Sequence, residues 1–284
     1  MTLGPGLAWA TALPLLLLVA AAIGLPFVWR GGAVLWTCVQ GLAGGVGAAG
    51  SCAAHDLVSD RYYLQALLNT LGLSLASTAI ALVLGLGAAI ALAGLAPLRR
   101  PAMVLVNLGA NFAGVPLALA LTLLFGSQGI LSSLATRVGL PLPVDLQGLG
   151  GLLLAYVAFQ APLATLMLMS PVQMLDAALP EAAATLGASP HRYWARVGLP
   201  LLLPSLVEVA SLLFANAAAA YATPFALSGT AANVLAVRIA ALVSGDIFAQ
   251  PELSSLLALV LFALLVAVIG GARWWAARLR REVA

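Results

Sequence analysis

The sequence predicts an all-α integral membrane protein with about six transmembrane helices, on two observations. Of the 284 residues, 63% are hydrophobic and only 7% are charged, with a mean hydropathy of +1.10. Soluble domains carry roughly 25% charged residues. In addition, apolar runs of about 20 residues, the length that crosses a bilayer, recur along the chain. A water-soluble fold could not bury this much apolar surface, so lipid must cover most of it.

Six apolar runs are long enough to span a bilayer. They are residues 7–28, 64–95, 102–125, 149–171, 201–227 and 253–271. The first lacks the basic amino-terminal region of a secretory signal peptide and is followed by further spans, so it is predicted to be a membrane helix. Residues 31–60 are rich in Gly and Ala and predict an external loop. Cys38 and Cys52 lie in that loop, either as a disulfide or as two free thiols.

Arginine placement predicts the orientation of the spans. All twelve basic residues are Arg, of which eight lie on one side of the predicted membrane and four on the other. The eight are Arg99, Arg100, Arg192, Arg196, Arg273, Arg278, Arg280 and Arg281. Since cytoplasmic loops carry an excess of basic residues, this side is predicted to be cytoplasmic. Both termini are then inside the cell.

Residue types that the chain lacks exclude several functions. A P-loop ATPase needs a Lys to reach the nucleotide phosphates, and the chain has none. The two histidines, His55 and His191, lie in loops on opposite sides, and no HExxH, GxSxG or paired intramembrane carboxylates occur. Neither an enzyme nor a metal site is therefore predicted. The net charge of +3 is too small to indicate a nucleic-acid surface.

The loop between the fourth and fifth spans carries the most specific pattern. Pro180 suits the first position of a helix, Glu181 its first turn, and the three alanines that follow favour helix without adding bulk. Gly187 can end that helix in a left-handed conformation. Ser189 and Pro190 then suit the N-cap and first residue of a second helix. The pattern predicts two short cytoplasmic helices. The first is either a docking surface for another protein or an ordinary capped loop.

This loop resembles the EAA signature of type I ATP-binding-cassette (ABC) importer permeases. The signature is Glu-Ala-Ala, three residues, Gly, nine residues, an aliphatic residue, one residue and Leu-Pro. The matching positions are Glu181, Ala182, Ala183, Gly187, Val197, Leu199 and Pro200. Val in the place of Ile is the one departure from the signature. The resemblance extends over roughly residues 62–273.

The resemblance implies a complete transporter architecture. Residues 1–61 would form the first transmembrane helix and external loop, residues 62–273 the permease core with its EAA loop at 179–200, and residues 274–284 a cytoplasmic tail. A coupling helix around Glu181–Gly187 would sit in a groove of a cytoplasmic ABC ATPase dimer, which would bind the ATP and Mg²⁺. This chain would bind no cofactor itself.

The same resemblance implies further partners. A second permease, identical or homologous, would complete the pore in the bilayer of a bacterial inner membrane. An extracytoplasmic binding protein would deliver the substrate. The residues implied in ATPase coupling are Glu181, Ala182, Ala183, Gly187, Leu199 and Pro200.

A finer resemblance bears on the cargo. Residues 111–117, 216–224 and 244–253 resemble segments of permeases in the polyamine, opine and phosphonate group. They imply a small solute such as putrescine or spermidine, with aminoethylphosphonate, thiamine and ferric iron as alternatives. A secondary transporter or a membrane-embedded enzyme is the more distant alternative for the whole chain.

Polar residues inside the apolar runs are candidates for the translocation path. They are Asn111, Gln160, Glu208, Asn216 and Tyr221. Hydrogen bonds between helices explain each of them equally well. Glu208 lies about two turns into the fifth span, where it could instead pair with Arg192 or Arg196. Three prolines, Pro116, Pro162 and Pro224, would permit helix breaks that line a cavity.

Overall fold

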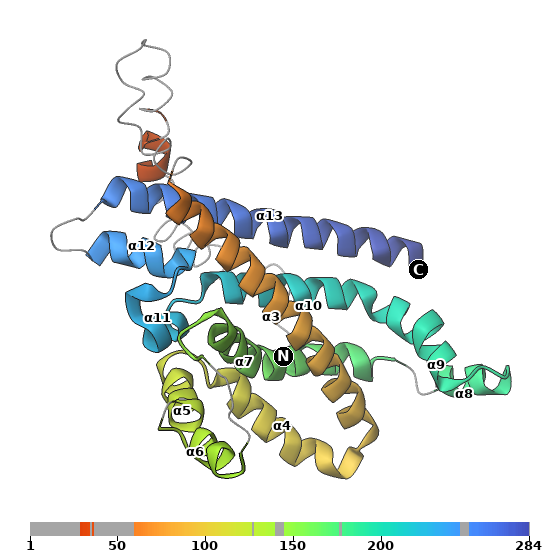
Figure 1. Ribbon diagram of the computed structural model, residues 1–284. Coiled ribbons are helices and arrows are strands. Elements are labelled where there is room, and N and C mark those ends of the chain that lie inside the picture. Colours follow the sequence, from red (N-terminus) through yellow and green to blue (C-terminus); the bar gives the residue numbers. More distant parts are fainter. Residues whose placement is uncertain are drawn as a thin grey trace, which may run out of the picture. The chain divides into compact units, whose positions relative to one another are not determined.

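The computed structural model describes residues 29–34, 36, 60–126, 128–139, 145–175, 178–244 and 250–283. Within these ranges every regular element is a helix, which confirms the all-α prediction (Figure 1). Three predictions lie outside the described residues. They are the first span at residues 7–28, most of the external loop before residue 60, and the state of the two cysteines.

Eleven α-helices make up most of the described chain from residue 60 onward. They are α3 (Arg61–Gly94), α4 (Ala96–Asn111), α5 (Val115–Phe125), α6 (Ile130–Arg137), α7 (Leu149–Gln173), α8 (Ala178–Thr185), α9 (Pro190–Tyr193), α10 (Leu199–Ala219), α11 (Ala222–Ser228), α12 (Leu235–Ser244) and α13 (Pro251–Val283). A π-helical turn, Trp194–Gly198, joins α9 to α10. The predicted boundary between core and tail at residue 273 falls inside α13.

Among the described residues, five helical runs are long and apolar enough to cross a membrane. They are Arg61–Gly94, Val115–Arg137 (of which residue 127 is not described), Leu149–Gln173, Pro190–Ala219 and Pro251–Arg281. A bent pair, Ala222–Ala231 and Leu235–Ser244, would make a sixth. Five of the six predicted runs fall on described residues, which matches the five long helices, although the third and fifth predicted runs differ from the helices and the bent pair was not predicted.

The third predicted run, residues 102–125, is two helices rather than one. Between α4 and α5, Gly114 adopts φ +73° and ψ −141°, a backbone conformation that residues other than glycine rarely adopt. The helix therefore ends before it, and the membrane-length run begins at Val115. Pro116 follows in the first turn of α5, as expected for a proline beside a helix break.

The fifth predicted run, residues 201–227, is also divided. The backbone is extended at Ala220, so α10 ends there and α11 begins two residues later with Pro224 in its first turn. Pro162 behaves differently, because it lies within α7, which continues past it to Gln173. Helix breaks thus occur beside two of the three prolines that would permit them, and none occurs at Pro162.

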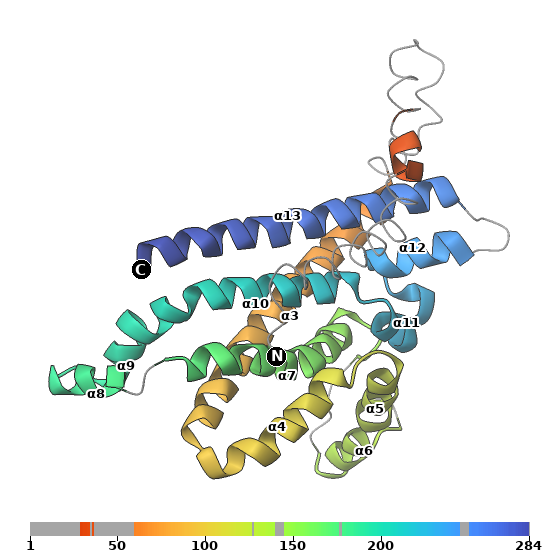
Figure 2. The same cartoon turned by 180° about the vertical axis from the view of Figure 1, so that it is seen from behind.

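The described residues divide into two compact units. One comprises those up to Ala66 together with Arg238–Ala263, and the other comprises Leu67–Val237 with the chain from Leu264 onward. In the larger unit α7 lies between α4 and α10 (Figures 1 and 2). This helix is apolar on all sides, as expected for a buried helix. One cluster of buried side chains surrounds its first half and a second cluster surrounds the rest.

Glycine allows two close helix approaches to α7. A Cβ atom built on Gly85 of α3 would lie 2.4 Å from the Cβ atom of Ala164 and 2.9 Å from the backbone nitrogen of Thr165. A Cβ atom on Gly109 of α4 would lie 2.9 Å from Cγ of Pro162. Small residues let helix backbones approach closely, which is how transmembrane helices commonly associate. Glycines at these two positions therefore set how closely α3 and α4 pack on α7.

In the smaller unit, the first residues of α3 contact the part of α12 from Arg238 onward. The guanidinium of Arg238 lies 4.3 Å from the centroid of the Tyr62 ring, a cation–π contact. The hydroxyl of Ser254 donates a hydrogen bond to the carbonyl oxygen of Ile239 at 3.2 Å. These contacts join α3, α12 and α13 within the unit.

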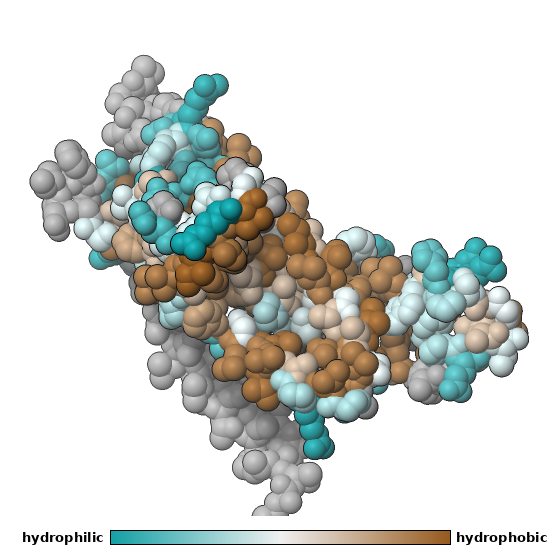
Figure 3. Space-filling model, turned by 60° about the horizontal axis from the view of Figure 1, so that its bottom comes forward, coloured by the Kyte–Doolittle hydropathy of each residue, from teal (hydrophilic) through white to brown (hydrophobic). Residues whose placement is uncertain are grey.

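The surface of the larger unit is that of a membrane protein. Large apolar side chains such as Leu68, Val83 and Leu105 are exposed. Brown, apolar residues cover much of the face in Figure 3, whereas paler and teal residues gather at the right-hand end, where α8 and α9 lie. Exposed apolar area of this extent marks a surface covered by lipid or by another protein.

Candidate functional site

The EAA loop forms the two short helices that the sequence predicts. Helix α8 begins at Ala178, two residues earlier than expected, so Pro180 is its third residue rather than its first. This position still suits proline, because the first four N–H groups of a helix have no partner within the helix. Glu181 lies in the first turn, as predicted.

The end of α8 is a Schellman motif centred on Gly187. This residue has φ +75°. Its N–H donates to the carbonyl oxygen of Ala184, and the N–H of Ala188 donates to that of Ala183, both at 2.9 Å. Only glycine adopts this left-handed conformation without strain. The predicted helix stop is therefore confirmed, and it fixes the angle at which the chain leaves α8.

The second helix starts as predicted and passes into α10 through a wider turn. Ser189 is the N-cap, with its hydroxyl oxygen accepting the N–H of Arg192 at 3.4 Å. In the π-helical turn that follows, the N–H of Leu199 reaches back to the carbonyl oxygen of Trp194. Pro200 has no N–H, and its ring would crowd the carbonyl of residue 196 in a regular helix. The wider turn accommodates the Leu-Pro pair of the motif.

Aromatic packing fixes the base of the loop. Tyr193 is buried, and its ring meets that of Trp194 edge to face with centroids 5.5 Å apart. The Trp194 ring lies over Gly198, where an added Cβ atom would come within 2.6 Å of it. A largely apolar hollow of about 400 Å³ separates the loop from the ends of α3 and α7. Ile90 and Val172 line it from those helices, and Ala184 lines it from α8.

The motif residues divide into two groups. Glu181, Ala182 and Gly187 are exposed on and beside α8, and Ala183 is half-buried. Leu199 and Pro200 are exposed as well, but they lie at the start of α10, beyond the aromatic base. The two groups therefore belong to different parts of the loop.

One residue of this surface was not identified from the sequence. Leu186, which directly follows the last residue of α8, is 87% exposed. A large apolar side chain directly after a short, Ala-rich helix could have been a signal, since such a helix cannot bury it.

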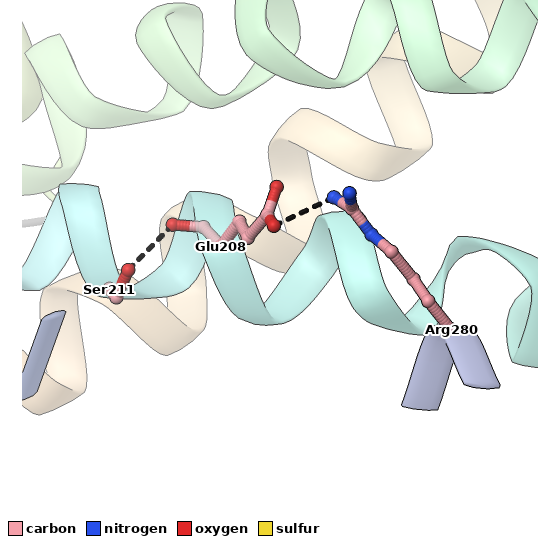
Figure 4. Close-up of polar contacts among 3 residues, drawn as sticks. All are labelled: Glu208, Ser211 and Arg280. Atoms are coloured by element: carbon pink, nitrogen blue, oxygen red, sulfur yellow. Dashed lines mark hydrogen bonds and ion pairs between the residues drawn. The ribbon is translucent and has the colours of Figure 1, made fainter. Parts of the chain in front are cut away.

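Glu208 forms an ion pair that the sequence did not predict. Its Oε1 accepts a hydrogen bond from Nη2 of Arg280 at 2.7 Å, which links α10 to the last turns of α13 within the larger unit (Figure 4). Neither of the two expected partners, Arg192 and Arg196, makes this contact. The Arg280 and Glu208 side chains are 59% and 39% exposed. The pair is therefore at a surface rather than in the core.

We expect the Glu208–Arg280 pair to contribute little to stability. Exposed ion pairs typically contribute about 0.2–1 kcal/mol. A double-mutant cycle with Glu208→Gln and Arg280→Gln, measured by equilibrium unfolding in mixed micelles, should give a coupling energy in that range. Arg281→Gln is the matched control and should show no coupling to Glu208→Gln. A coupling of several kcal/mol would mean that the pair is desolvated in the membrane.

The other path candidates differ in their surroundings. Gln160 is fully buried, and its Nε2 donates to the carbonyl oxygen of Leu213 at 3.2 Å, which joins α7 to α10. Asn111 is exposed and donates to the carbonyl of Asn107 in its own helix. Asn216 is exposed too. The exposed Tyr221 ring stacks on Phe225 with centroids 5.1 Å apart. Gln160 thus makes a hydrogen bond between helices, which was the alternative to a place on the translocation path.

The two helix breaks of the larger unit meet. The N–H of Gly114, before α5, donates to Oγ1 of Thr223, in α11, at 3.1 Å. Asn111 ends the helix before the first break, and Tyr221 lies directly before α11 at the second. The structure thereby brings the two segments carrying these candidates to one junction. Gly114 and Thr223 were not identified as site residues, because no local signal links two positions 109 residues apart.

Related sequences are transport permeases. The putative 2-aminoethylphosphonate transport system permease protein PhnU of Salmonella typhi is 30% identical over 204 residues, which cover 69% of this chain and 68% of PhnU. The PhnU of Salmonella choleraesuis is 32% identical over 180 residues, or 62% of its length. The thiamine transport system permease protein ThiP of Brucella suis is 26% identical over 239 residues, and the chain spans 42% of that protein. No family model matches the sequence.

Solved structures share the fold. In a crystal structure of a bacterial alginate ABC transporter in complex with an alginate pentasaccharide-bound periplasmic protein, one chain matches with a TM-score of 0.73 at 17% identity, covering 96% of this chain and 94% of that one. A second alginate importer structure gives 0.69 at 18% identity. With the EAA loop folded as described and PhnU matched over two thirds of its length, the chain belongs to the permease subunits of type I ABC importers.

Proposed function

We propose that this chain forms part of the translocation pathway of a bacterial ABC importer and receives its driving force through α8. The observation that carries the proposal is the exposure of α8. The Schellman motif at Gly187 and the packed rings of Tyr193 and Trp194 fix how this helix is presented. Cytoplasmic ATPase subunits, a second permease and an extracytoplasmic binding protein complete the assembly. Both termini are cytoplasmic in an inner membrane, as the arginine distribution favours.

The chemistry of α8 suits a protein partner. Ala182 and Ala183 let another backbone approach closely, and Leu186 supplies an apolar anchor that has no cover within the described chain. The exposed carboxylate of Glu181 offers a charge-assisted hydrogen bond to an arginine of the ATPase. Leu199 and Pro200 contribute indirectly, by setting the wide turn that connects the helix to α10.

The translocation pathway is proposed to pass the point where the two helix breaks meet, at Gly114 and Thr223. Broken helices free backbone groups, which in membranes are tolerated where they line a cavity or are buried in protein. Asn111, Asn216 and Tyr221 present polar groups near these breaks and remain the path candidates. Gln160 and Glu208 are less suited, because each already holds a partner.

The cargo is proposed to be a small polar solute like those named for the relatives, 2-aminoethylphosphonate and thiamine. These two are among the expected alternatives, whereas the expected polyamine has no specific support from them. The described spans hold two carboxylates: Glu208, which is paired with Arg280, and Glu252, in the first turn of α13. Desolvated polyamine cations would require carboxylate partners along the path.

Glu181→Lys is expected to weaken ATPase binding. Reversing this charge removes a hydrogen-bond acceptor and repels a basic partner, which should lower retention of the ATPase at least about tenfold. ATP-driven uptake by proteoliposomes containing permease, ATPase and binding protein should fall with it. Glu252→Lys, the same charge reversal in the first turn of α13 and away from α8, is the matched control and should retain both.

Two outcomes would overturn the proposal. Normal ATPase retention and uptake by Glu181→Lys would show that α8 is not the docking helix. Solute uptake by the permease chain alone, driven by an ion gradient, would instead identify a secondary transporter.

A further inference from the structure

The last turns of α13 gather four arginines and two tryptophans within residues 273–281. The structure separates these arginines by role. Arg280 is held by Glu208, and Ala276, one turn earlier on the same side, is fully buried. This side of the helix therefore faces the protein. Even with Glu282 counted, four Arg and one Glu leave residues 273–282 with a net charge of +3.

The opposite side of the helix is open. Trp274, Arg278 and Arg281 are spaced by four and three residues, so they share one face. Trp274 and Trp275 are 63% and 56% exposed. The guanidinium of Arg278 lies 4.7 Å from the centroid of the Trp274 ring, which holds the cation beside an apolar surface.

A hollow of about 380 Å³ lies against this face. Gly271, the two tryptophans, Arg278 and Leu279 line it. The hollow is uncovered at Gly271, since a Cβ atom on this residue would meet nothing within 4 Å. The hollow thus combines aromatic and aliphatic walls with a cation at its rim.

We propose that this hollow binds the headgroup of an anionic phospholipid, with the phosphate at Arg278 and Arg281 and the glycerol and upper acyl chain against the two tryptophans. Tryptophan rings favour the headgroup level of a bilayer. Arginine clusters directly after a transmembrane helix attract anionic lipids. The site goes beyond the proposed transport function, and depends on it only in placing this end of α13 at the cytoplasmic surface.

A lipid fits the site better than a protein partner. Both cations and both rings lie on the last turns of one membrane-spanning helix, at the depth where phosphates occur. The hollow extends along the helix as far as Gly271, which lies on the side of the apolar span, where an acyl chain would continue. A protein groove would instead need apolar anchors further along the cytoplasmic side.

Tryptophan quenching by brominated lipids tests the site. The full chain is placed in nanodiscs of phosphatidylcholine with increasing fractions of phosphatidylglycerol, with bromine on the acyl chains of one lipid at a time. Subtracting the signal of Trp274→Phe/Trp275→Phe removes the contribution of the chain's other tryptophans. Brominated phosphatidylglycerol should quench at a lower mole fraction than brominated phosphatidylcholine. Arg278→Gln/Arg281→Gln should lower the relative binding constant roughly 25-fold, a factor of about five per arginine.

The matched control removes the same charge elsewhere on the same proposed side. Arg99→Gln/Arg100→Gln should leave the preference unchanged. Gly271→Leu fills the hollow without altering any charge, and it should also reduce the preference. Equal quenching by the two lipids, or an equal loss in both arginine variants, would overturn the site. Because none of these measurements needs an ATPase or a substrate, failure here would leave the transport proposal standing.

Discussion

Replacing Gly187 with valine is expected to uncouple ATP hydrolysis from transport while the chain still folds in the membrane. Gly187 has φ +75°, which a β-branched residue adopts only with strain. Forcing it there costs about 1–3 kcal/mol. The loop would relieve this strain by changing the exit angle from α8. The population of correctly presented α8 should fall roughly 5- to 150-fold. Solute uptake and ATP hydrolysis by the reconstituted transporter are the measurements.

Gly139→Val is the matched control for this variant. Gly139 has the same φ of +75°, and a Cβ atom at either position meets nothing within 4 Å. Its substitution introduces the same backbone strain after α6, away from the EAA loop. If both variants lose uptake equally, or if Gly187→Val transports normally, the conformation of Gly187 does not serve coupling.

Replacing Gly85 with leucine is expected to unfold or severely destabilise the protein. A Cβ atom alone would lie 2.4 Å from that of Ala164 and 2.9 Å from a backbone nitrogen of α7. The clash involves helix backbone, so a side-chain rotation cannot relieve it, and α3 must move away from α7. Overpacking of this kind typically costs about 1–3 kcal/mol and more where backbone must shift. The detergent-solubilised variant should elute as aggregate in size-exclusion chromatography or melt many degrees lower.

Gly87→Leu provides the comparison two residues along the same helix. A Cβ atom on Gly87 meets nothing within 4 Å. This variant should fold, elute and melt like the unmodified chain. A normal elution profile and melting temperature for Gly85→Leu would show that α3 and α7 do not approach as closely as described.

The EAA loop could be predicted in detail because its signals are local. A left-handed glycine, a serine cap and prolines near helix starts each act within one turn of the chain. The start of α8 was two residues off, because proline is tolerated throughout a first turn and does not mark one position within it. Composition and run length likewise predicted the membrane class, since neither depends on how the helices pack.

What the sequence could not predict depends on residues far apart in the chain. Glu208 and Arg280 are 72 positions apart, so the nearer arginines were the natural expectation. Gln160 and Leu213 are separated by 53 positions, and only the packing of α7 on α10 gives the buried amide its partner. Pro116 and Pro224 each permit a break nearby, but the hydrogen bond that brings the two breaks together joins Gly114 to Thr223, 109 positions apart. Periodicity and hydropathy contain no signal for such pairings.

The wide turn at Trp194–Gly198 gives the transporter a mechanical property. Through it α9 continues into α10, and Pro190–Ala219 form one helical run of 30 residues. At 1.5 Å per residue this rod is about 45 Å long. Its near end is joined to α8, which ends in the Schellman motif, and its far end, Ala219, lies two residues before Tyr221 and close to the hydrogen-bonded breaks. Under the proposed function, a displacement of α8 would turn this rod and move its opposite end, beside the point where the two helix breaks meet.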